Sequence, residues 1–214
     1  MRIDNEDKEG TVKSIEFPLP DGSKAALEGY IDRVDVCKEG NKLYVRVVDY
    51  KTGTKKFDLE DVAMGINMQM LLYLFSIWKD NNGNFKKEMQ FSGEIIPAGV
   101  LYLIAKAGSV SEAPTTDAAT VYDLAAKNIS RNGLLIKDEQ ILRLMEEKLE
   151  GKYIPIKISK TKLEENKKKN PEGDSYTKDS YKSLKSLEEM GALLNQITST
   201  VTKLATEIKS GKSS

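Results

Sequence analysis

Apolar and polar positions alternate in three segments near the amino end of the chain, a pattern that predicts β-strands. The segments cover residues 12–17, about 26–37 and about 42–51. Turn-forming residues at 18–22 follow the first segment, and residues 38–41 follow the second. Because these connections are short, we expect the three strands to form an antiparallel meander.

The spacing of apolar residues then changes to steps of three and four, which predicts one long helix from Leu59 to about Ile77. Asp58 is a suitable N-cap for this helix, and residues 81–83 are a suitable stop. The nearly all-apolar run at 99–105 is typical of a central strand that is covered on both faces. A long helix between two strands brings a crossover connection into the sheet, so we expect an α/β or α+β fold.

The second half of the chain carries weaker patterns. Residues 107–120 predict a polar loop, residues 137–149 a short helix, and residues 153–158 an edge strand. A heptad-like seam from Leu187 to Ile208 predicts a long amphipathic helix. Coiled-coil pairing and packing along its own domain both explain the seam. The second explanation is favoured because the sequence holds only one such helix.

Composition limits the chemistry of the chain more than its fold. The 214 residues include no histidine and one cysteine, Cys37. These counts exclude Ser–His–Asp hydrolysis, His-ligated zinc and an iron–sulfur site built from this chain alone. No apolar run approaches the ~20 residues of a membrane helix, and no secretory signal is apparent. We therefore expect a cytoplasmic protein without membrane contact, and a single thiol is compatible with that compartment.

Charge argues against an autonomous basic DNA-binding protein, because 33 Lys and Arg balance 33 Asp and Glu. It does not exclude nucleic-acid chemistry, because a local basic stretch or a partner can attract phosphate groups. Residues 152–170 form such a stretch, with seven Lys and two Glu and hence a local net charge of +5. We favour a solvated loop for it over a surface that follows a phosphate backbone.

Two carboxylates, Asp32 and Asp49, lie in line with β-branched residues on adjacent predicted strands, and Lys51 shares the face of Asp49. Buried carboxylates repel each other unless a cation lies between them, and Mg²⁺ binds such pairs while keeping several waters. This is the arrangement that metal-dependent phosphodiester hydrolysis requires. On spacing alone, an ordinary cross-strand ion-pair cluster explains these residues equally well. On the opposite face, we expect Arg33 and Asp35 to form a structural ion pair.

Three motifs in order resemble the RecB-type PD-(D/E)XK nucleases. They are G-Y-I-D-R-V-D at 29–35, V-V-D-Y-K-T-G at 47–53 and Q-M-L-L-Y at 69–73. The resemblance implies a restriction-endonuclease-like core with a mixed central sheet, flanking helices and a long C-terminal helix. It implies a nuclease core at 1–110 and, at 111–214, an extension that carries the Lys-rich loop and the long helix packed on the core.

The same resemblance assigns roles to individual residues. Asp32, Asp49 and the Tyr50 carbonyl match the metal ligands, with Mg²⁺ as the expected ion and Mn²⁺ as a substitute. Lys51 matches the catalytic lysine. Gln69 and Tyr73 lie four residues apart on one helix face and match a pair that lines the active site and places the DNA strand. Without the motifs, a helix-surface glutamine and a core tyrosine are the simpler explanations. Two further carboxylates, Glu16 and Glu28, are auxiliary candidates without a firm match.

A finer similarity, to the nuclease domains of the AddB-type family, rests on residues 132–135, 141–145 and 153–156. It implies DNA exonuclease activity in double-strand-break repair, within a bacterial helicase–nuclease that includes an AddA-type subunit and delivers single-stranded DNA. The chain lacks the upstream helix and the cysteines of that family. We therefore expect a fragment whose full-length protein holds a [4Fe–4S] cluster and which cuts poorly alone. A non-catalytic scaffold or strand-guiding module is the alternative function.

Overall fold

The computed structural model describes residues 1–4, 11–52, 57–105, 129–159 and 175–211. The predicted loop at 107–120 and most of the Lys-rich segment, from residue 160 onward, lie outside the described residues.

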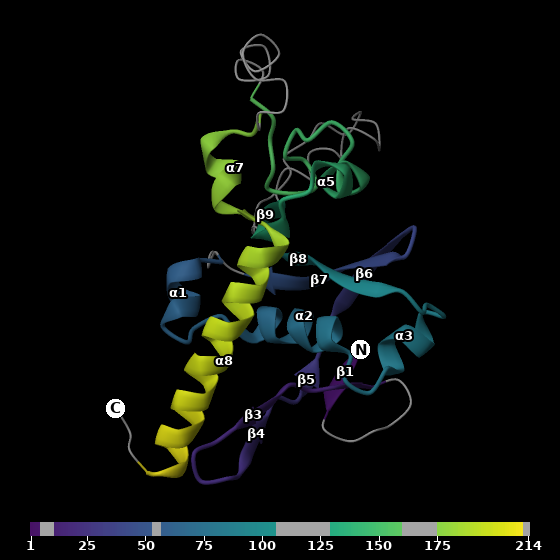
Figure 1. Cartoon of the computed structure of the whole chain (residues 1–214). Helices are drawn as coiled ribbons and strands as arrows, with labels where there is room; N and C mark the ends of the chain where they lie inside the picture. Colours follow the sequence, from purple (N-terminus) through teal and green to yellow (C-terminus); the bar gives the residue numbers. More distant parts are fainter. Residues whose placement is uncertain (5–10, 53–56, 106–128, 160–174, 212–214) are drawn as a thin grey trace, which may run out of the picture.

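A five-stranded mixed sheet forms the centre of the molecule (Figure 1), in the order β10-β9-β8-β7-β6. Neighbours pair antiparallel at β6–β7 and β8–β9 and parallel at β7–β8 and β9–β10. The predicted α+β class, mixed sheet and central strand are confirmed, because the apolar run at 99–105 lies within β8, between β7 and β9. The strand bounds are β6 (Arg33–Glu39), β7 (Lys42–Thr52), β8 (Glu94–Ala105), β9 (Ile129–Ile136) and β10 (Leu184–Lys185).

The amino-terminal strands are shorter than the sequence predicts. One small sheet has the order β2-β1-β5, and β3 and β4 form a separate hairpin around the predicted turn at 18–22. The predicted meander and the continuous strand at 26–37 are therefore wrong. The reason is a change of partner: β5 pairs with β1, β6 pairs with β7, and between them Ile31 donates its backbone N–H to Met1. The bounds are β1 (Arg2–Asp4), β2 (Thr11–Lys13), β3 (Glu16–Pro18), β4 (Lys24–Ala26) and β5 (Gly29–Tyr30).

Two helices, α1 (Leu59–Ala63) and α2 (Gln69–Lys79), replace the predicted single helix. The break is explained by Gly65 at φ +85° and Asn67 at φ +59°, because the left-handed region cannot continue an α-helix. The predicted N-cap is confirmed, since the Asp58 side chain accepts the backbone N–H of Glu60. Helix α2 packs against β7 and β8, and a short α3 (Asn84–Glu88) follows it.

The predicted C-terminal helix is confirmed as α8 (Leu187–Lys209), which runs along one side of the molecule (Figure 1). Its buried residues Met190, Leu194 and Ile197 belong to the same core cluster as the side chains of α2. Near its end, Lys209 Nζ lies 2.6 Å from Asp21 Oδ2 in the β3–β4 turn. Helix α8 thus packs along its own domain. None of the helices in the described part of the chain is long and apolar enough to cross a membrane.

Helices α5 (Glu139–Met145) and α7 (Lys178–Lys182) flank a second, smaller core. Helix α5 is shorter than the predicted 137–149 and begins after Asp138, whose side chain accepts the N–H of Ile141. The predicted edge strand at 153–158 is wrong, because only isolated bridges form there.

A buried carboxylate explains why that edge strand is absent. Glu146, only 6% exposed, accepts backbone N–H groups from four residues of the segment that follows. Those donors are no longer available to a strand ladder. Burial alone would raise the pKa of Glu146, but the four hydrogen bonds lower it below its ordinary value. The donors are Glu150, Lys152, Tyr153 and Ile154, at 2.9 to 3.0 Å.

We expect Glu146→Gln to lower the free energy of unfolding by about 2 kcal/mol at neutral pH, because hydrogen bonds to a charged group contribute about 1.5–3 kcal/mol. The folded-state pKa is depressed, so this stabilisation is full above the unfolded pKa of about 4.3 and is lost as pH falls through the folded value. Urea unfolding at several pH values should therefore show the difference between wild type and variant shrinking in acid. Glu139→Gln, on the exposed side of the same helix, is the control and should change stability by less than about 0.5 kcal/mol. Equal stability of wild type and Glu146→Gln at neutral pH would contradict the expectation.

Candidate active site

Strand β7 carries Asp49 and Lys51 on one face near its carboxyl end. The side chain of Asp49 is 16% exposed, and Lys51 Nζ lies 2.8 Å from its Oδ2 atom. This ion pair does not have hydrogen-bond geometry, and Asp49 Oδ2 is one of two buried side-chain polar atoms in the described part of the chain that lack a hydrogen-bond partner. An anionic oxygen thus keeps accepting capacity inside the protein, which is costly unless a cation completes it.

Asp32 lies in the connection between β5 and β6, where the chain changes sheets. Arg33 opens β6 opposite Val48, so Asp32 is positioned just beyond the last pair of the ladder, beside Asp49. Its Oδ2 atom accepts a long hydrogen bond, 3.4 Å, from the backbone N–H of Tyr50. The tertiary structure therefore brings the Asp32 carboxylate to the backbone between Asp49 and Lys51, although Asp32 is not itself in a strand.

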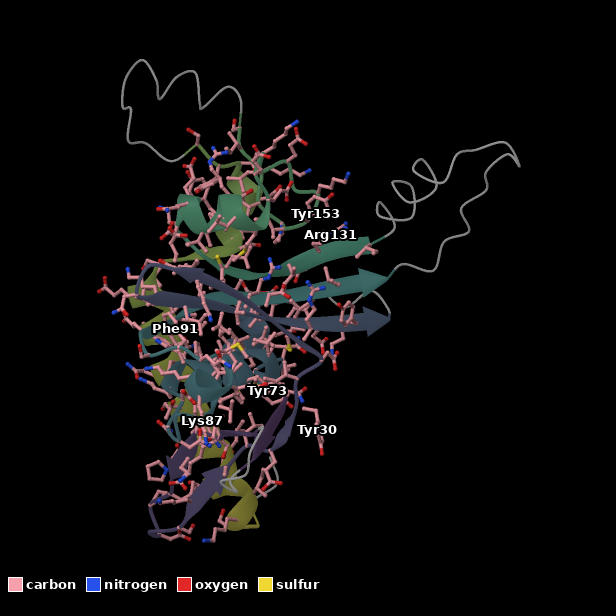
Figure 2. All side chains as sticks on the ribbon, turned by 90° about the vertical axis from the view of Figure 1, so that its right-hand side faces the viewer. Tyr30, Tyr73, Lys87, Phe91, Arg131 and Tyr153 are labelled. Carbon is pink, nitrogen blue, oxygen red and sulfur yellow. The ribbon has the colours of Figure 1, made fainter. Side chains whose placement is uncertain are left out.

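The pair Gln69 and Tyr73 lies on one face of the first turns of α2. Gln69 Nε2 donates to Tyr73 Oη at 2.6 Å. Tyr73 is 2% exposed and belongs to the main core, whereas Gln69 is exposed. The Tyr73 hydroxyl fills the space above Gly29, where an added Cβ would lie 1.9 Å from Oη. Figure 2 shows Tyr73 in the middle of the molecule, and its contact with Gly29 ties α2 to the strand that precedes Asp32.

The expected ion pair on the opposite face is confirmed and is larger than predicted. Asp35 accepts from Arg33 Nε at 2.6 Å and from Arg46 Nη2 at 2.6 Å. Burial alone would raise the pKa of Asp35, but the two guanidinium groups lower it. Of the auxiliary candidates, Glu16 pairs with Lys24 at 2.6 Å within the β3–β4 hairpin, so that its carboxylate is engaged outside the site.

Three residues beside Asp49 were not predicted as part of the site. Tyr102 on β8 and Asn132 on β9 lie in the same cross-strand row as Asp49, and hence on the same face. Phe57 stacks on Tyr102 with ring centroids 5.7 Å apart, and its backbone N–H donates to Asn132. Burial, and then the charge of Asp49, raise the pKa of Tyr102, so its hydroxyl stays neutral. A signal was present, because Tyr102 is the one side chain with a polar group in the run 99–105.

The donor set fits a hard divalent cation. The two carboxylates and the Tyr50 carbonyl are oxygen ligands, which Mg²⁺ prefers, and the incomplete hydrogen bonding of Asp49 Oδ2 provides accepting capacity. In the described ranges, no group of three or more His, Cys, Asp or Glu side chains could hold a metal ion. An ion here would depend on two carboxylates, backbone and water, which is the coordination typical of Mg²⁺ rather than of structural zinc.

Comparison with known proteins yields one family and a consistent set of relatives. The family model of the PD-(D/E)XK nuclease superfamily matches residues 2–212. An ATP-dependent helicase/deoxyribonuclease subunit of the AddB type from Clostridium kluyveri is 32% identical over 202 residues, 94% of this chain and 16% of the relative. Proteins of the same name from Clostridium novyi and Ruminiclostridium cellulolyticum are 36% and 32% identical over 68% and 71% of the chain. The chain spans only 12 to 16% of the length of these three relatives.

Proposed function

Because the chain belongs to the PD-(D/E)XK nuclease superfamily, we propose that it is a Mg²⁺-dependent deoxyribonuclease domain that hydrolyses phosphodiester bonds at DNA ends. The observation that carries this proposal is the cluster of Asp32, Asp49 and Lys51, in which a buried carboxylate oxygen lacks a hydrogen-bond donor. Oxygen ligands beside a mobile ammonium group are the elements that phosphodiester hydrolysis needs.

Each residue of the cluster has a part in the proposed mechanism. Asp32, Asp49 and the Tyr50 carbonyl would hold the ion, which when bound polarises the phosphoryl group and lowers the pKa of water. Lys51 is half exposed, so its ammonium group is free to orient the attacking water and to offset charge that develops on the phosphate oxygens. Gln69, held by Tyr73 through their hydrogen bond, presents its amide to the DNA strand.

We further propose that the domain works inside a larger helicase–nuclease in the bacterial cytoplasm. The relatives are named as subunits of an ATP-dependent helicase/deoxyribonuclease, which supports an AddA-type partner. Helicase modules would separate the strands of a broken end and deliver single-stranded DNA to this exonuclease site during double-strand-break repair. The balanced charge of the chain fits such delivery, since the domain does not need to attract DNA by itself.

A non-catalytic role as a scaffold or strand-guiding module is the second candidate. It is favoured by the Lys51–Asp49 ion pair, which already offsets part of the charge of Asp49 without a metal ion. In a scaffold, the carboxylates would make structural contacts only, and the domain would take up no ion at this position.

Calorimetric titration with Mn²⁺ separates the two functions on the chain itself. A nuclease site predicts heat of ion uptake by the wild type and its loss in Asp32→Ala. It also predicts that saturating Mn²⁺ raises the free energy of unfolding of the wild type alone, by about 2.7 kcal/mol at 100 times the Kd. Glu16→Ala removes a carboxylate that pairs within the hairpin and should titrate like the wild type. Identical titrations of wild type and Asp32→Ala would support the scaffold.

A further inference from the structure

A pocket of about 810 Å³ lies at the end of the sheet where β9 begins. Three cationic side chains line it: Arg131 from β9, and Lys152 and Lys157 from the segment that follows α5. The hydroxyl side chains of Thr177 and Ser180 form part of the opposite wall. We call it the strand-end pocket. Nothing in the proposed hydrolysis uses it.

The strand-end pocket lies on the same edge of the sheet as the candidate active site. Strand β8 is parallel to β7 and antiparallel to β9, so the amino end of β9 meets the carboxyl end of β7. Arg131 pairs with Leu103, which pairs with Tyr50, the neighbour of Asp49. Two strand spacings of about 4.8 Å therefore separate the Tyr50 and Arg131 backbones, about 10 Å in all.

One wall of the pocket is held in place by buried interactions. Glu146 binds the backbone N–H groups of the segment 150–154, and this segment carries Lys152 and Tyr153. The Lys157 side chain lies across Gly151, where φ is +77° and an added Cβ would be 2.4 Å from Lys157 Cε. The basic side chains thus project from a backbone that is already ordered, which reduces the entropic cost of binding.

The chemistry of the wall matches single-stranded nucleic acid. Tyr153 is 54% exposed, and Lys152 Nζ lies 5.5 Å from the centre of its ring. An exposed aromatic ring beside cations is the combination by which proteins stack unpaired bases and bind the adjoining phosphates. Two carboxylates, Glu150 and Asp179, also line the pocket, so three cations face two anions. Asp179 has Lys182 Nζ at 3.9 Å, which further offsets its charge.

We propose that the strand-end pocket binds single-stranded DNA at nucleotides next to the one being cut, with phosphates at Lys152 and Lys157 and a base on Tyr153. The proposal rests on the proposed nuclease function and extends it, because it assigns a second contact that holds the strand in register with the active site. Such a contact would favour an unpaired strand over a duplex, whose bases are already stacked.

The test is DNA binding by the 214-residue chain in an Asp49→Asn background, which cannot cut. Fluorescence anisotropy with a labelled oligothymidylate measures the Kd at several salt concentrations. In Lys152→Gln/Lys157→Gln, the slope of log affinity against log salt should fall by about 1.4, since each cation on single-stranded DNA contributes about 0.7. Tyr153→Leu should weaken binding about tenfold and leave the slope unchanged, because stacking is not ionic.

Lys87→Gln is the matched control. Lys87 is an exposed lysine on α3, far from Arg131 and Tyr153 in Figure 2, and its replacement should change neither affinity nor slope. Thermal unfolding verifies that each variant is folded, and Tyr153→Leu provides an independent reading if the double variant is not. No measurable binding by the parent, or equal Kd and slope in parent and both pocket variants, would overturn the proposal.

Failure of this inference is distinguishable from failure of the proposed function. A chain that takes up Mn²⁺ at Asp32 but binds DNA independently of Lys152, Lys157 and Tyr153 retains the nuclease site and loses the pocket. A chain that binds DNA through the pocket but takes up no ion is a strand-guiding module without a nuclease centre.

Discussion

Asp49→Asn in the full-length helicase–nuclease is expected to reduce metal-dependent cutting of single-stranded DNA by about 10³- to 10⁴-fold. Asparagine has nearly the same shape, so the change removes one negative charge and one anionic ligand from the site. Losing several kcal/mol of charge stabilisation in the transition state corresponds to that factor, at about 1.4 kcal/mol for each tenfold. Because Asp49 Oδ2 lacks a hydrogen-bond donor, the amide disrupts no hydrogen bond to that atom.

Rates of release of short products from a single-stranded substrate, with and without Mg²⁺, measure this effect. ATP-driven unwinding by the same complex should be unchanged, which separates loss of chemistry from loss of assembly. Asp58→Asn is the control, because asparagine caps a helix about as well as aspartate and this residue lies outside the cluster. Cutting by Asp49→Asn at the wild-type rate would reject the proposed nuclease site.

Lys51→Ala should lower the rate of cutting by about 10³-fold by a different route. The ammonium group is proposed to act on the attacking water and on charge that forms in the transition state, and removal of one such group typically costs about 10²- to 10³-fold or more in kcat. Uptake of Mn²⁺ should persist, because both carboxylates remain and a neighbouring positive charge is gone. A loss of turnover with retained ion binding is thus the signature that separates Lys51 from Asp49.

Single-turnover cutting and Mn²⁺ calorimetry on the same variant make that comparison. Lys42→Ala, at the other end of β7, changes an exposed lysine in the same strand and should leave both measurements unaltered. Wild-type turnover in Lys51→Ala would remove the lysine from the mechanism. Loss of ion binding together with turnover would instead indicate that Lys51 supports the structure of the site.

The strand pattern could be predicted wherever one stretch of chain keeps one partner. Alternation in residues 42–51 assigns Asp49 and Lys51 to the same face, and the structure has them 2.8 Å apart. The same argument predicts the pair of Arg33 and Asp35 on the other face. Alternation is a local consequence of the extended backbone, so it survives any change in the surroundings of the strand.

The predictions that failed concern places where the backbone changes partner or direction. The pattern predicts a continuous strand at 26–37, but the first part pairs with β1 and the last with β7. The helix expected to continue past Ala63 is broken at Gly65, which adopts a left-handed φ despite an unbroken apolar period. Periodicity reports which face is buried and does not reveal that the axis of the element changes.

The sequence alone determined the class of this protein and the residues of its candidate site, because three ordered motifs and the alternation within strands depend on local backbone geometry. The tertiary structure alone decided that Asp32 reaches the backbone beside Asp49, that Tyr102 and Asn132 lie in the same row, and that Glu146 orders the segment carrying Lys152. These relations join residues far apart in the chain. They arise from strand pairing and from the requirement that buried polar groups find partners, which no local pattern encodes.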